Sequence, residues 1–314
     1  MDTAAHIFCA LTLDCVLGDP RWLPHPVKLI GNAALALESP LRKNIANAKF
    51  AGVVAVIIVV AATAGITAIT LKTAGLIHPF LGNTASILLL YTTFAARDLS
   101  DHARAVYKPL IIGAIDTARK QVAMLVGRDT DEMAEADITR ATVESVAENC
   151  VDGVTAPLIY AFCGGAVAAM IYKAINTLDS TFGYKNSRYF AFGWASARLD
   201  DIANFVPARL SAVLMVVAAT LLQLDYRRAW RVMWRDHANH PSPNGGWSES
   251  ACAGALQIRL GGKNSYFGRV SCRPYMGDNI TPLRAHHIHT VIKLMWVTTL
   301  LVATVGIITK LLLP

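Results

Sequence analysis

The chain has 314 residues, of which 54% are hydrophobic and only 16% are charged. A soluble domain usually carries about 25% charged residues, so this composition excludes an ordinary soluble enzyme and indicates an integral membrane protein. The net charge of +7 is typical of cytoplasmic loops rather than a nucleic-acid-binding surface, because membrane proteins gather Lys and Arg on the cytoplasmic side. The six cysteines form no CxxC pair, which favours reduced, buried thiols over a disulfide framework.

The chain is predicted to begin with an apolar run over residues 3–18, which contains Asp14. The next ten residues, Gly18-Asp-Pro-Arg-Trp-Leu-Pro-His-Pro-Val27, hold three prolines and cannot form a regular helix. One interpretation is an interfacial loop anchored by Trp22. The other is a functional loop, because ionisable residues such as Asp19 and His25 beside an apolar run tend to be functional.

Several later runs have the length of a membrane span. Residues 50–71 carry no charge and predict the clearest transmembrane helix. A second helix is expected to begin near residue 80, and residues 154–172, 205–224 and 290–313 are further candidates. Gly164 and Gly165 interrupt the run over 154–172, which suits a broken or re-entrant segment.

We therefore predict an all-α polytopic integral membrane protein with about five to six membrane segments, one of them a candidate re-entrant segment. Residues 1–314 are expected to form a single domain, with long polar cytoplasmic regions at 97–153 and 225–289. Loops 20–49, 97–154 and 224–290 carry 5, 7 and 9 Lys and Arg residues, and a simple alternating count would then place 176–204 outside the cell. A site shared across 154–172 therefore requires re-entry or deep burial of this segment, which we favour.

Three carboxylates precede the run over 154–172. Glu144, Glu148 and Asp152 repeat every four residues, so on a helix they lie along one face. They repel one another, and no near Lys or Arg on their C-terminal side offsets this. The pattern predicts a cation site, with Mg²⁺ as the first choice because it prefers oxygen ligands. The alternative is a solvated helix face.

Cations follow the same run. Lys173, Lys185, Arg198 and Arg209 lie with Asp179 near apolar segments, and such groups suit a polyanion such as a nucleotide or organophosphate. The chain has no Walker A motif, and its glycine pairs at 245–246 and 261–262 lack the spacing of a phosphate loop.

The order of these motifs resembles that of a known family. The resemblance rests on Asp14-x-x-x-Gly-Asp-Pro-x-x-x-Pro-His-Pro26, Glu144-Ser-x-Ala-Glu-Asn-x-x-Asp-Gly-x-x-Ala-Pro157, Tyr172-Lys-Ala-x-Asn-Thr-x-Asp179, Gly183-Tyr-Lys185, Arg198-x-Asp-Asp-x-x-Asn-x-x-Pro-x-Arg209 and Ser242-Pro-Asn-Gly-Gly246. Over nearly its whole length the chain looks like adenosylcobinamide-phosphate synthase, the CbiB/CobD family of cobalamin biosynthesis.

This resemblance implies a multi-pass enzyme of the inner membrane with its active site facing the cytoplasm. Such an enzyme joins adenosylcobyric acid to (R)-1-aminopropan-2-ol phosphate and consumes ATP, with adenosylcobinamide phosphate as product. Family members are also similar to AmpE, a membrane regulator of β-lactamase induction. A non-catalytic membrane sensor of this type and a membrane transporter are the alternatives.

The ligase chemistry suggests roles for the candidate residues. Carboxylates before residues 154–172 and cations after them are expected to converge around one magnesium-bound nucleotide. The expected metal ligands are Glu144, Glu148 and Asp152; the expected catalytic residues are Asp19, His25, Asp179 and Lys185; and the expected ATP-binding or substrate-binding residues are Lys173, Asn176, Arg198, Arg209 and Asn244.

Overall fold

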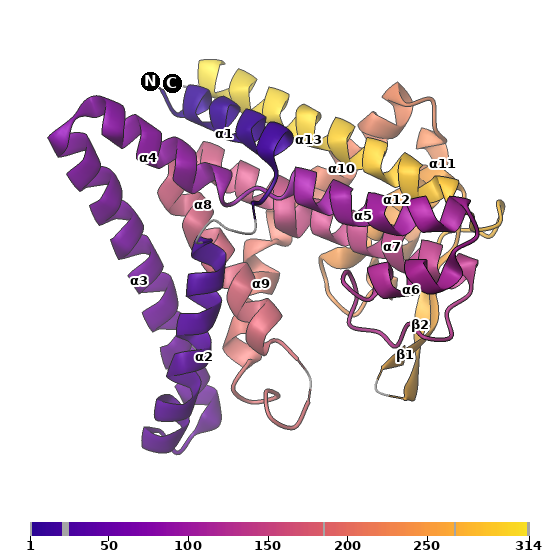
Figure 1. The fold of residues 1–314 in the computed structure, drawn as a ribbon, viewed down its shortest axis with the longest axis horizontal. Coiled ribbons are helices and arrows are strands. Elements are labelled where there is room, and N and C mark those ends of the chain that lie inside the picture. Colours follow the sequence, from indigo (N-terminus) through magenta and orange to yellow (C-terminus); the bar gives the residue numbers. More distant parts are fainter. Residues whose placement is uncertain (1, 21–24, 185, 267, 313–314) are drawn as a thin grey trace. The chain divides into compact units, whose positions relative to one another are not determined.

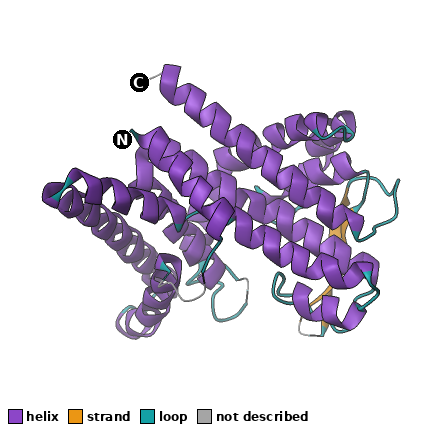
Figure 2. Ribbon diagram, turned by 45° about the horizontal axis from the view of Figure 1, so that its top comes forward, coloured by secondary structure: helices purple, strands orange, loops and turns teal. Residues whose placement is uncertain are grey.

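The computed structural model describes residues 2–20, 25–184, 186–266 and 268–312, and this part of the chain is helical apart from one two-stranded sheet (Figures 1 and 2). The predicted all-α membrane class is confirmed, with the sheet as an addition that the sequence did not suggest. Contacts divide the chain into two compact units: residues 1–95 with 156–204 and 305–314, and residues 96–155 with 205–304. This division is finer than the predicted single domain over 1–314. Both predicted polar regions, 97–153 and 225–289, belong to the second unit.

The first unit consists of apolar helices whose starts are set by polar caps. The Asp2 carboxylate accepts a hydrogen bond from the Ala5 N–H at 2.8 Å, and the Asn47 side chain accepts from the Lys49 N–H at 3.0 Å. Such caps satisfy backbone donors that have no partner within the helix. The helices are α1 (Thr3–Leu17), α2 (Pro26–Asn44), α3 (Ala48–Ile77), α4 (Pro79–Tyr91), α8 (Ala156–Phe182), α9 (Trp194–Ala203) and the last turns of α13 (His286–Leu312).

The second unit packs helices around a core that includes Val143 and Val146 of α7 and Met215 of α10. A π-helical turn, η1 (Val151–Thr155), follows α7 directly. The unit also contains α5 (Ala96–Ile111), α6 (Ile115–Val122), α7 (Glu135–Cys150), α10 (Phe205–Leu221), α11 (Tyr226–Asp236), the 3₁₀ turn η2 (His237–Asn239), α12 (Gly245–Leu256), the antiparallel strands β1 (Leu260–Tyr266) and β2 (Arg269–Met276), and most of α13.

The glycine pair in α8 breaks the helix, as the sequence suggested. Gly164 has φ −149° and ψ 26°, and Gly165 has φ 62° and ψ −153°. The second pair of angles lies in a region that only glycine adopts readily. The apolar run over 154–172 is therefore two helical pieces joined at a kink rather than one regular helix.

Three helical stretches of the described chain are long and apolar enough to cross a membrane, namely Ala48–Ile77, Glu135–Phe182 and His286–Leu312. A fourth is obtained if the bent pair Trp194–Ala203 and Phe205–Leu221 counts as one span. The predicted number of five to six was too high. The first apolar run forms a helix of only 15 residues, and the run from residue 73 to 96 is divided between the end of α3 and the 13-residue α4.

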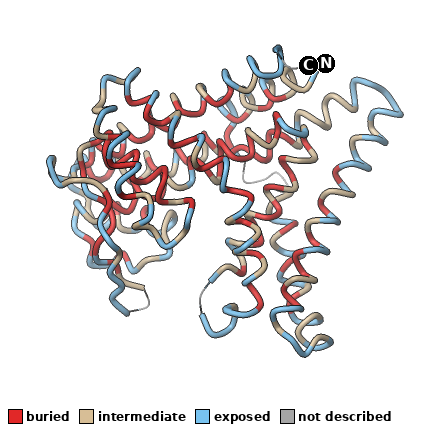
Figure 3. Tube along the Cα trace, turned by 180° about the vertical axis from the view of Figure 1, so that it is seen from behind, coloured by how far each residue is buried: buried red, intermediate tan, exposed pale blue. Residues whose placement is uncertain are grey.

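The clearest span, α3, has an apolar outer face. Its side chains Phe50, Ile57, Ile66 and Ile69 are each between 59% and 66% exposed, and Figure 3 shows exposed positions recurring along the helices. A run of exposed large apolar side chains of this kind is unfavourable in water. The pattern supports a lipid-facing helix.

Gly52 allows α3 to approach the chain before α9. A Cβ atom at Gly52 would lie 1.9 Å from the backbone oxygen of Phe192, whereas a Cβ at Gly65 in the same helix meets nothing within 4 Å. We expect Gly52→Ala to lower the free energy of unfolding by about 1–3 kcal/mol, because backbone atoms would have to shift. Gly65→Ala is the matched control and should cause no loss. Thermal unfolding in detergent tests the pair, and equal stability of the two variants would contradict this close approach of the two backbones.

Candidate functional site

In the second unit, consecutive turns of α7 carry the buried Glu144 and the half-buried Glu148. Glu144 and Glu148 lie four residues apart, so they share a helix face as predicted. The Glu144 side chain is only 4% exposed, and most of α7 around it is buried as well. A buried carboxylate is stable only with compensating partners, and the structure supplies different partners for these two residues.

Glu144 is held by a cation and by a strand backbone. The Arg128 Nη2 atom donates to Glu144 Oε2 at 2.5 Å, and the Arg128 side chain is only 7% exposed. The Gly261 N–H donates to Glu144 Oε1 at 2.7 Å. Burial alone would lower the pKa of Arg128, but the charge and hydrogen bond of Glu144 outweigh it and raise that pKa above its usual value. Arg128 is therefore the cation that compensates the buried Glu144 carboxylate.

A β-bulge directs the Gly261 N–H towards Glu144. Leu260 pairs with Met276 and Gly262 pairs with Arg273, and the register shifts between these two pairs. Gly261 lies at the shift with φ 81°, and a Cβ there would meet the Pro274 oxygen at 2.3 Å. Two residues of β2, Pro274 and Tyr275, lie opposite the single residue Gly261, so the extra residue of the bulge belongs to β2. Bulges often occur beside active sites. Here the bulge connects the hairpin to α7.

Glu148 belongs to a second cluster, with His240 and Glu249. One ligand atom from each of these three residues lies within 4.8 Å of the others. His240 Nε2 is 3.3 Å from Glu249 Oε1, and the two side chains are only 5% and 2% exposed. A Cβ at Gly245 would lie 2.7 Å from the His240 ring and 3.4 Å from Glu148 Oε1. The absence of a side chain at Gly245 therefore keeps the space beside the cluster open.

The cluster is electrostatically suited to a cation. Burial raises the pKa of Glu249 well above its ordinary value, and the charges of Glu144 and Glu148 raise it further. Burial also lowers the pKa of His240, although the Glu148 charge acts against this. An uncharged imidazole is the form that binds a metal ion. A divalent cation would offset the repulsion between the carboxylates.

Several buried donors of the second unit have no acceptor. Within the described chain, four buried nitrogen atoms of the second unit make no hydrogen bond: Arg128 Nη1, His240 Nε2, Trp247 Nε1 and Asn264 Nδ2. The close approach of His240 Nε2 to Glu249 lacks hydrogen-bond geometry. An unpaired buried donor costs about 1–3 kcal/mol, so the Arg, Trp and Asn donors fit an anion with several oxygens.

The residues therefore fit a magnesium–nucleotide ligand. The Glu148 and Glu249 carboxylates offer the oxygen atoms that Mg²⁺ prefers, and the unpaired donors suit phosphate oxygens. His240 adds a nitrogen, which also suits Mn²⁺ or Zn²⁺. The donor set thus admits more than one divalent metal.

Two predicted nucleotide-binding residues lie in the same unit and contact each other. The Arg209 Nη1 atom donates to Asn244 Oδ1 at 3.2 Å, and its guanidinium lies 3.6 Å from the Phe205 ring centroid and 4.9 Å from that of Trp247. Asn244 directly precedes α12, the helix that carries Glu249. Asn244, and Arg209 that contacts it, are therefore linked to the cluster by α12, because this helix follows Asn244 and carries Glu249.

Asp152 does not belong to the cluster of Glu148, His240 and Glu249. It lies in η1, where the chain follows π-helical rather than α-helical geometry. A π turn adds a residue to the turn, so the four-residue spacing does not guarantee that Asp152 shares the face of Glu144 and Glu148. Its assignment as a metal ligand stays a prediction.

The remaining predicted site residues belong to the first unit. His25 Nε2 lies 3.7 Å from Asp19 Oδ1, while His25 Nδ1 accepts from the Val27 N–H at 3.3 Å and caps α2. Asp19 and His25 thus lie close to each other, while their catalytic roles stay predictions. Burial of the nearby Tyr91 phenol and the charge of Asp19 raise the pKa of Tyr91.

The polar end of α8 carries three further candidates. The Asn176 Nδ2 atom lies 3.5 Å from Asp200 Oδ1, and Lys173 lies one turn earlier. A Cβ at Gly183 would lie 2.1 Å from Asp179 Oδ1. The absence of a side chain at Gly183 therefore allows the Asp179 carboxylate to pack against the end of the helix.

The last two candidates are Arg198 and Lys185. Arg198 is paired with Asp201 at 3.6 Å and is 65% exposed. Lys185 lies outside the described residues. Because the predicted carboxylates and most of the predicted cations belong to different units, their convergence on one nucleotide stays a prediction.

Sequence reasoning missed Arg128, His240 and Glu249. Arg128 stood in a glycine turn, Gly127-Arg-Asp-Thr130, and His240 in the proline-rich stretch 239–247. Glu249 had the clearest signal, because it is the sole ionisable residue in the small apolar helix Gly245–Leu256. The rule that drew attention to Asp14 applies equally to Glu249.

Membrane-length helices and a buried cluster of carboxylates, imidazole and guanidinium define a helical membrane protein with a polar internal site. Residues 7–295 match the family model described as CobD/Cbib protein. The chain is 46% identical over 295 residues to the cobalamin biosynthesis protein CobD of Geobacter metallireducens, covering 94% of this chain and 93% of that protein. It is 44% identical over 295 residues to the cobalamin biosynthesis protein CbiB of Salmonella typhimurium, covering 93% and 92%.

The chain belongs to the CobD/CbiB family. A further relative, the cobalamin biosynthesis protein CobD of Pelobacter propionicus, is 45% identical over 304 residues, covering 97% of this chain and 94% of that protein. No solved structure matches the chain.

Proposed function

We propose that this protein acts in cobalamin biosynthesis as an ATP-dependent amide ligase. It would join the carboxylate of adenosylcobyric acid to the amine of (R)-1-aminopropan-2-ol phosphate, or of a related amino alcohol, and give adenosylcobinamide phosphate. Similarity over nearly the full length to proteins named for cobalamin biosynthesis supports this. The structural observation that carries it is the partly buried cluster of Glu148, His240 and Glu249. The proposal places the enzyme in the inner membrane with its site facing the cytoplasm.

The reaction needs an activated carboxylate, because oxide is a poor leaving group. In the proposed sequence, a carboxylate oxygen of adenosylcobyric acid takes the γ-phosphoryl group of ATP, and ADP leaves. The amine nitrogen then attacks the acyl carbon, inorganic phosphate leaves, and a base takes the amine proton. An adenylate is the alternative activated form, with pyrophosphate and AMP as the leaving groups.

The second unit would bind the nucleotide. Glu148, Glu249 and His240 would hold the divalent metal, which when bound neutralises charge on the phosphates. Arg128 and Trp247 would donate their unpaired N–H groups to phosphate oxygens, as preorganised donors stabilise charge that develops in the transition state. Glu144 would orient Arg128 rather than bind the metal.

Other residues would bind the remaining substrate groups. Arg209, already held by Asn244 and two aromatic rings, is suited to a carboxylate or phosphate because its guanidinium is planar and fixed. In the first unit, His25 is the proposed proton acceptor with Asp19 as its partner. Asp179 is kept as a further ligand or base, and the proposed anion-binding groups are Lys173, Asn176, Lys185 and Arg198.

A direct assay tests this function. The full chain is purified in detergent and incubated with adenosylcobyric acid, aminopropanol phosphate and Mg-ATP, and the corrinoid products are measured by mass. We expect adenosylcobinamide phosphate and one ADP per amide formed. Absence of product from folded protein with all three substrates would rule the ligase out, and AMP in place of ADP would replace the acyl phosphate with an adenylate.

The broken helix α8 favours one alternative, a transporter, since discontinuous helices often line transport sites. Vesicles containing the purified protein distinguish the two. Accumulation of adenosylcobyric acid without amide product would indicate transport, whereas product formation in detergent, where no compartments exist, would not require it.

A further inference from the structure

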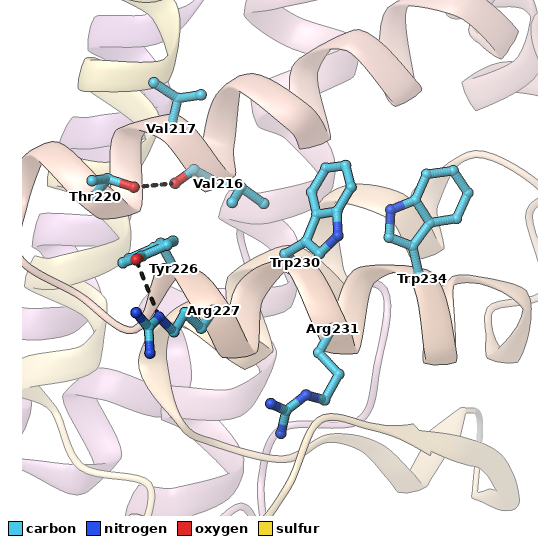
Figure 4. Close-up of a pocket in the computed structure, with 8 residues that line it drawn as sticks. All are labelled: Val216, Val217, Thr220, Tyr226, Arg227, Trp230, Arg231 and Trp234. Atoms are coloured by element: carbon cyan, nitrogen blue, oxygen red, sulfur yellow. Dashed lines mark hydrogen bonds between the residues drawn. The ribbon is translucent and has the colours of Figure 1, made fainter.

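A groove with a volume of about 760 Å³ lies between α10 and α11, both in the second unit (Figure 4). Val216, Val217 and Thr220 contribute to it from α10, and Tyr226, Trp230 and Trp234 from α11. None of these residues belongs to the cluster around Glu148. The groove is thus a second candidate site, and its lining is mostly apolar and aromatic.

The groove continues an apolar stripe on α10. Val206, Leu210, Val213, Val217 and Leu221 recur at helical spacing, and each is between 36% and 62% exposed. The stripe lies on one side of a helix that forms part of a candidate membrane span. Side chains of this kind face lipid when a helix crosses a bilayer. The groove therefore lies where the stripe of α10 ends.

Helix α11 has two chemically different sides. Tyr226, Trp230 and Trp234 repeat every four residues and are 41%, 47% and 51% exposed. Arg227 and Arg231 occupy the following positions, and Figure 4 shows the two Trp rings on one side of the helix and the Arg231 guanidinium on the other. Aromatic rings flanked by arginines are typical of a helix that lies in the membrane interface.

The arginines of α11 divide into paired and unpaired ones. Arg228 is paired with Asp225 at 3.1 Å, and Arg235 with Asp236 at 2.7 Å. Arg227 donates from Nε to the hydroxyl of the neighbouring Tyr226 at 3.1 Å and has no ion pair within the described chain, although the Asp225 charge acts on it from a greater distance. Arg231 has no ion pair within the described chain and is exposed. Neither cation beside the groove is therefore engaged in an ion pair within the part of the chain that the structure describes.

We propose that this groove binds an anionic phospholipid and that α11 lies in the membrane interface. The acyl chains would lie along Val216, Val217 and the Trp230 ring, which are suited to hydrocarbon. The headgroup phosphate would be bound by Arg227 and Arg231, because guanidinium groups bind phosphate oxygens with paired hydrogen bonds. A zwitterionic lipid would bind less tightly, since its headgroup has no net negative charge for the two basic residues to attract. The inference does not depend on the ligase reaction.

The full chain in nanodiscs tests the proposal. Phosphatidylcholine discs contain a few per cent of either phosphatidylglycerol or phosphatidylcholine brominated on its acyl chains, and quenching of tryptophan fluorescence reports the lipid beside Trp230 and Trp234. We expect stronger quenching by the brominated phosphatidylglycerol. Arg227→Gln combined with Arg231→Gln should reduce that preference about thirtyfold, as expected for the loss of two basic groups. Soluble glycerol phosphate should not compete.

Matched variants separate the contributions. Lys120→Gln with Arg269→Gln removes two exposed cations elsewhere in the unit and should keep the preference. Trp230→Phe with Trp234→Phe should remove most of the quenching in both kinds of disc. Equal quenching by the two lipids in wild-type protein would overturn the proposal. So would a dimer in dilute detergent that Val217→Asn dissociates, because a second copy would then fill the groove.

Discussion

Replacing Glu148 with glutamine is expected to lower ATP-dependent amide formation by at least about a hundredfold, because the site loses an anionic metal ligand and with it charge stabilisation of the transferring phosphoryl group. Glutamine has nearly the same shape, so the fold should persist. Mass detection of adenosylcobinamide phosphate measures the rate, and Mn²⁺ binding followed by electron paramagnetic resonance measures metal affinity. Both should fall together.

The matched control is Glu132→Gln, which makes the same chemical change at an exposed position of the same unit. It should retain the rate and the metal affinity of the wild-type chain. Wild-type turnover by Glu148→Gln at saturating metal would remove the carboxylate from the reaction. A loss of turnover with unchanged Mn²⁺ binding would place Glu148 near the substrate rather than on the metal.

Replacing Arg128 with methionine is expected to lower the free energy of unfolding by about 3–5 kcal/mol, because the Glu144 charge would stay buried without its partner. Both side chains are almost fully buried, at 7% and 4% exposed, so water cannot take over the role of Arg128. Unfolding by denaturant in detergent, followed by circular dichroism, measures the change.

A double variant distinguishes loss of the ion pair from loss of packing. Arg128→Met with Glu144→Gln removes both charges and keeps an acceptor for the Gly261 N–H. It should be more stable than Arg128→Met by about 1–3 kcal/mol, a usual coupling energy for groups in contact. If the second substitution restores nothing, the cost of Arg128→Met arises from packing and the ion pair is not the cause.

Local patterns of the sequence were sufficient for part of the fold. The uncharged run from residue 50 became α3, Pro79 begins α4, and Gly164 with Gly165 breaks α8. These features depend on hydrophobic length and on backbone preferences of single residues. The number of spans was overestimated, because the first apolar run and the run that begins near residue 80 form helices of only 15 and 13 residues.

Only some residues of the candidate site could be predicted from the sequence, and the reason differs from that for the fold. Glu144 and Glu148 were found because a helix places residues four apart on one face. Their partners come from distant parts of the chain: Gly261 from a β-bulge 117 residues beyond Glu144, and His240 from the turn before α12. No local periodicity encodes such contacts. The regular four-residue spacing likewise did not predict the π-helical turn that contains Asp152.

The bulge at Gly261 has a consequence for how such chains can diverge. Most of the hydrogen bonds from α7 to the hairpin use main-chain atoms of the hairpin: the Gly261 N–H donates to Glu144, and the Arg140 guanidinium donates to the Gly261 and Lys263 carbonyl oxygens. The Arg140 guanidinium also donates to the Asn264 side chain. Main-chain atoms are the same for every amino acid. Substitutions at the tip of the hairpin, between β1 and β2, can therefore give related proteins different recognition surfaces. The end of β1 at Gly261 and Gly262 would stay the same, and Glu144 and Glu148 would keep their surroundings.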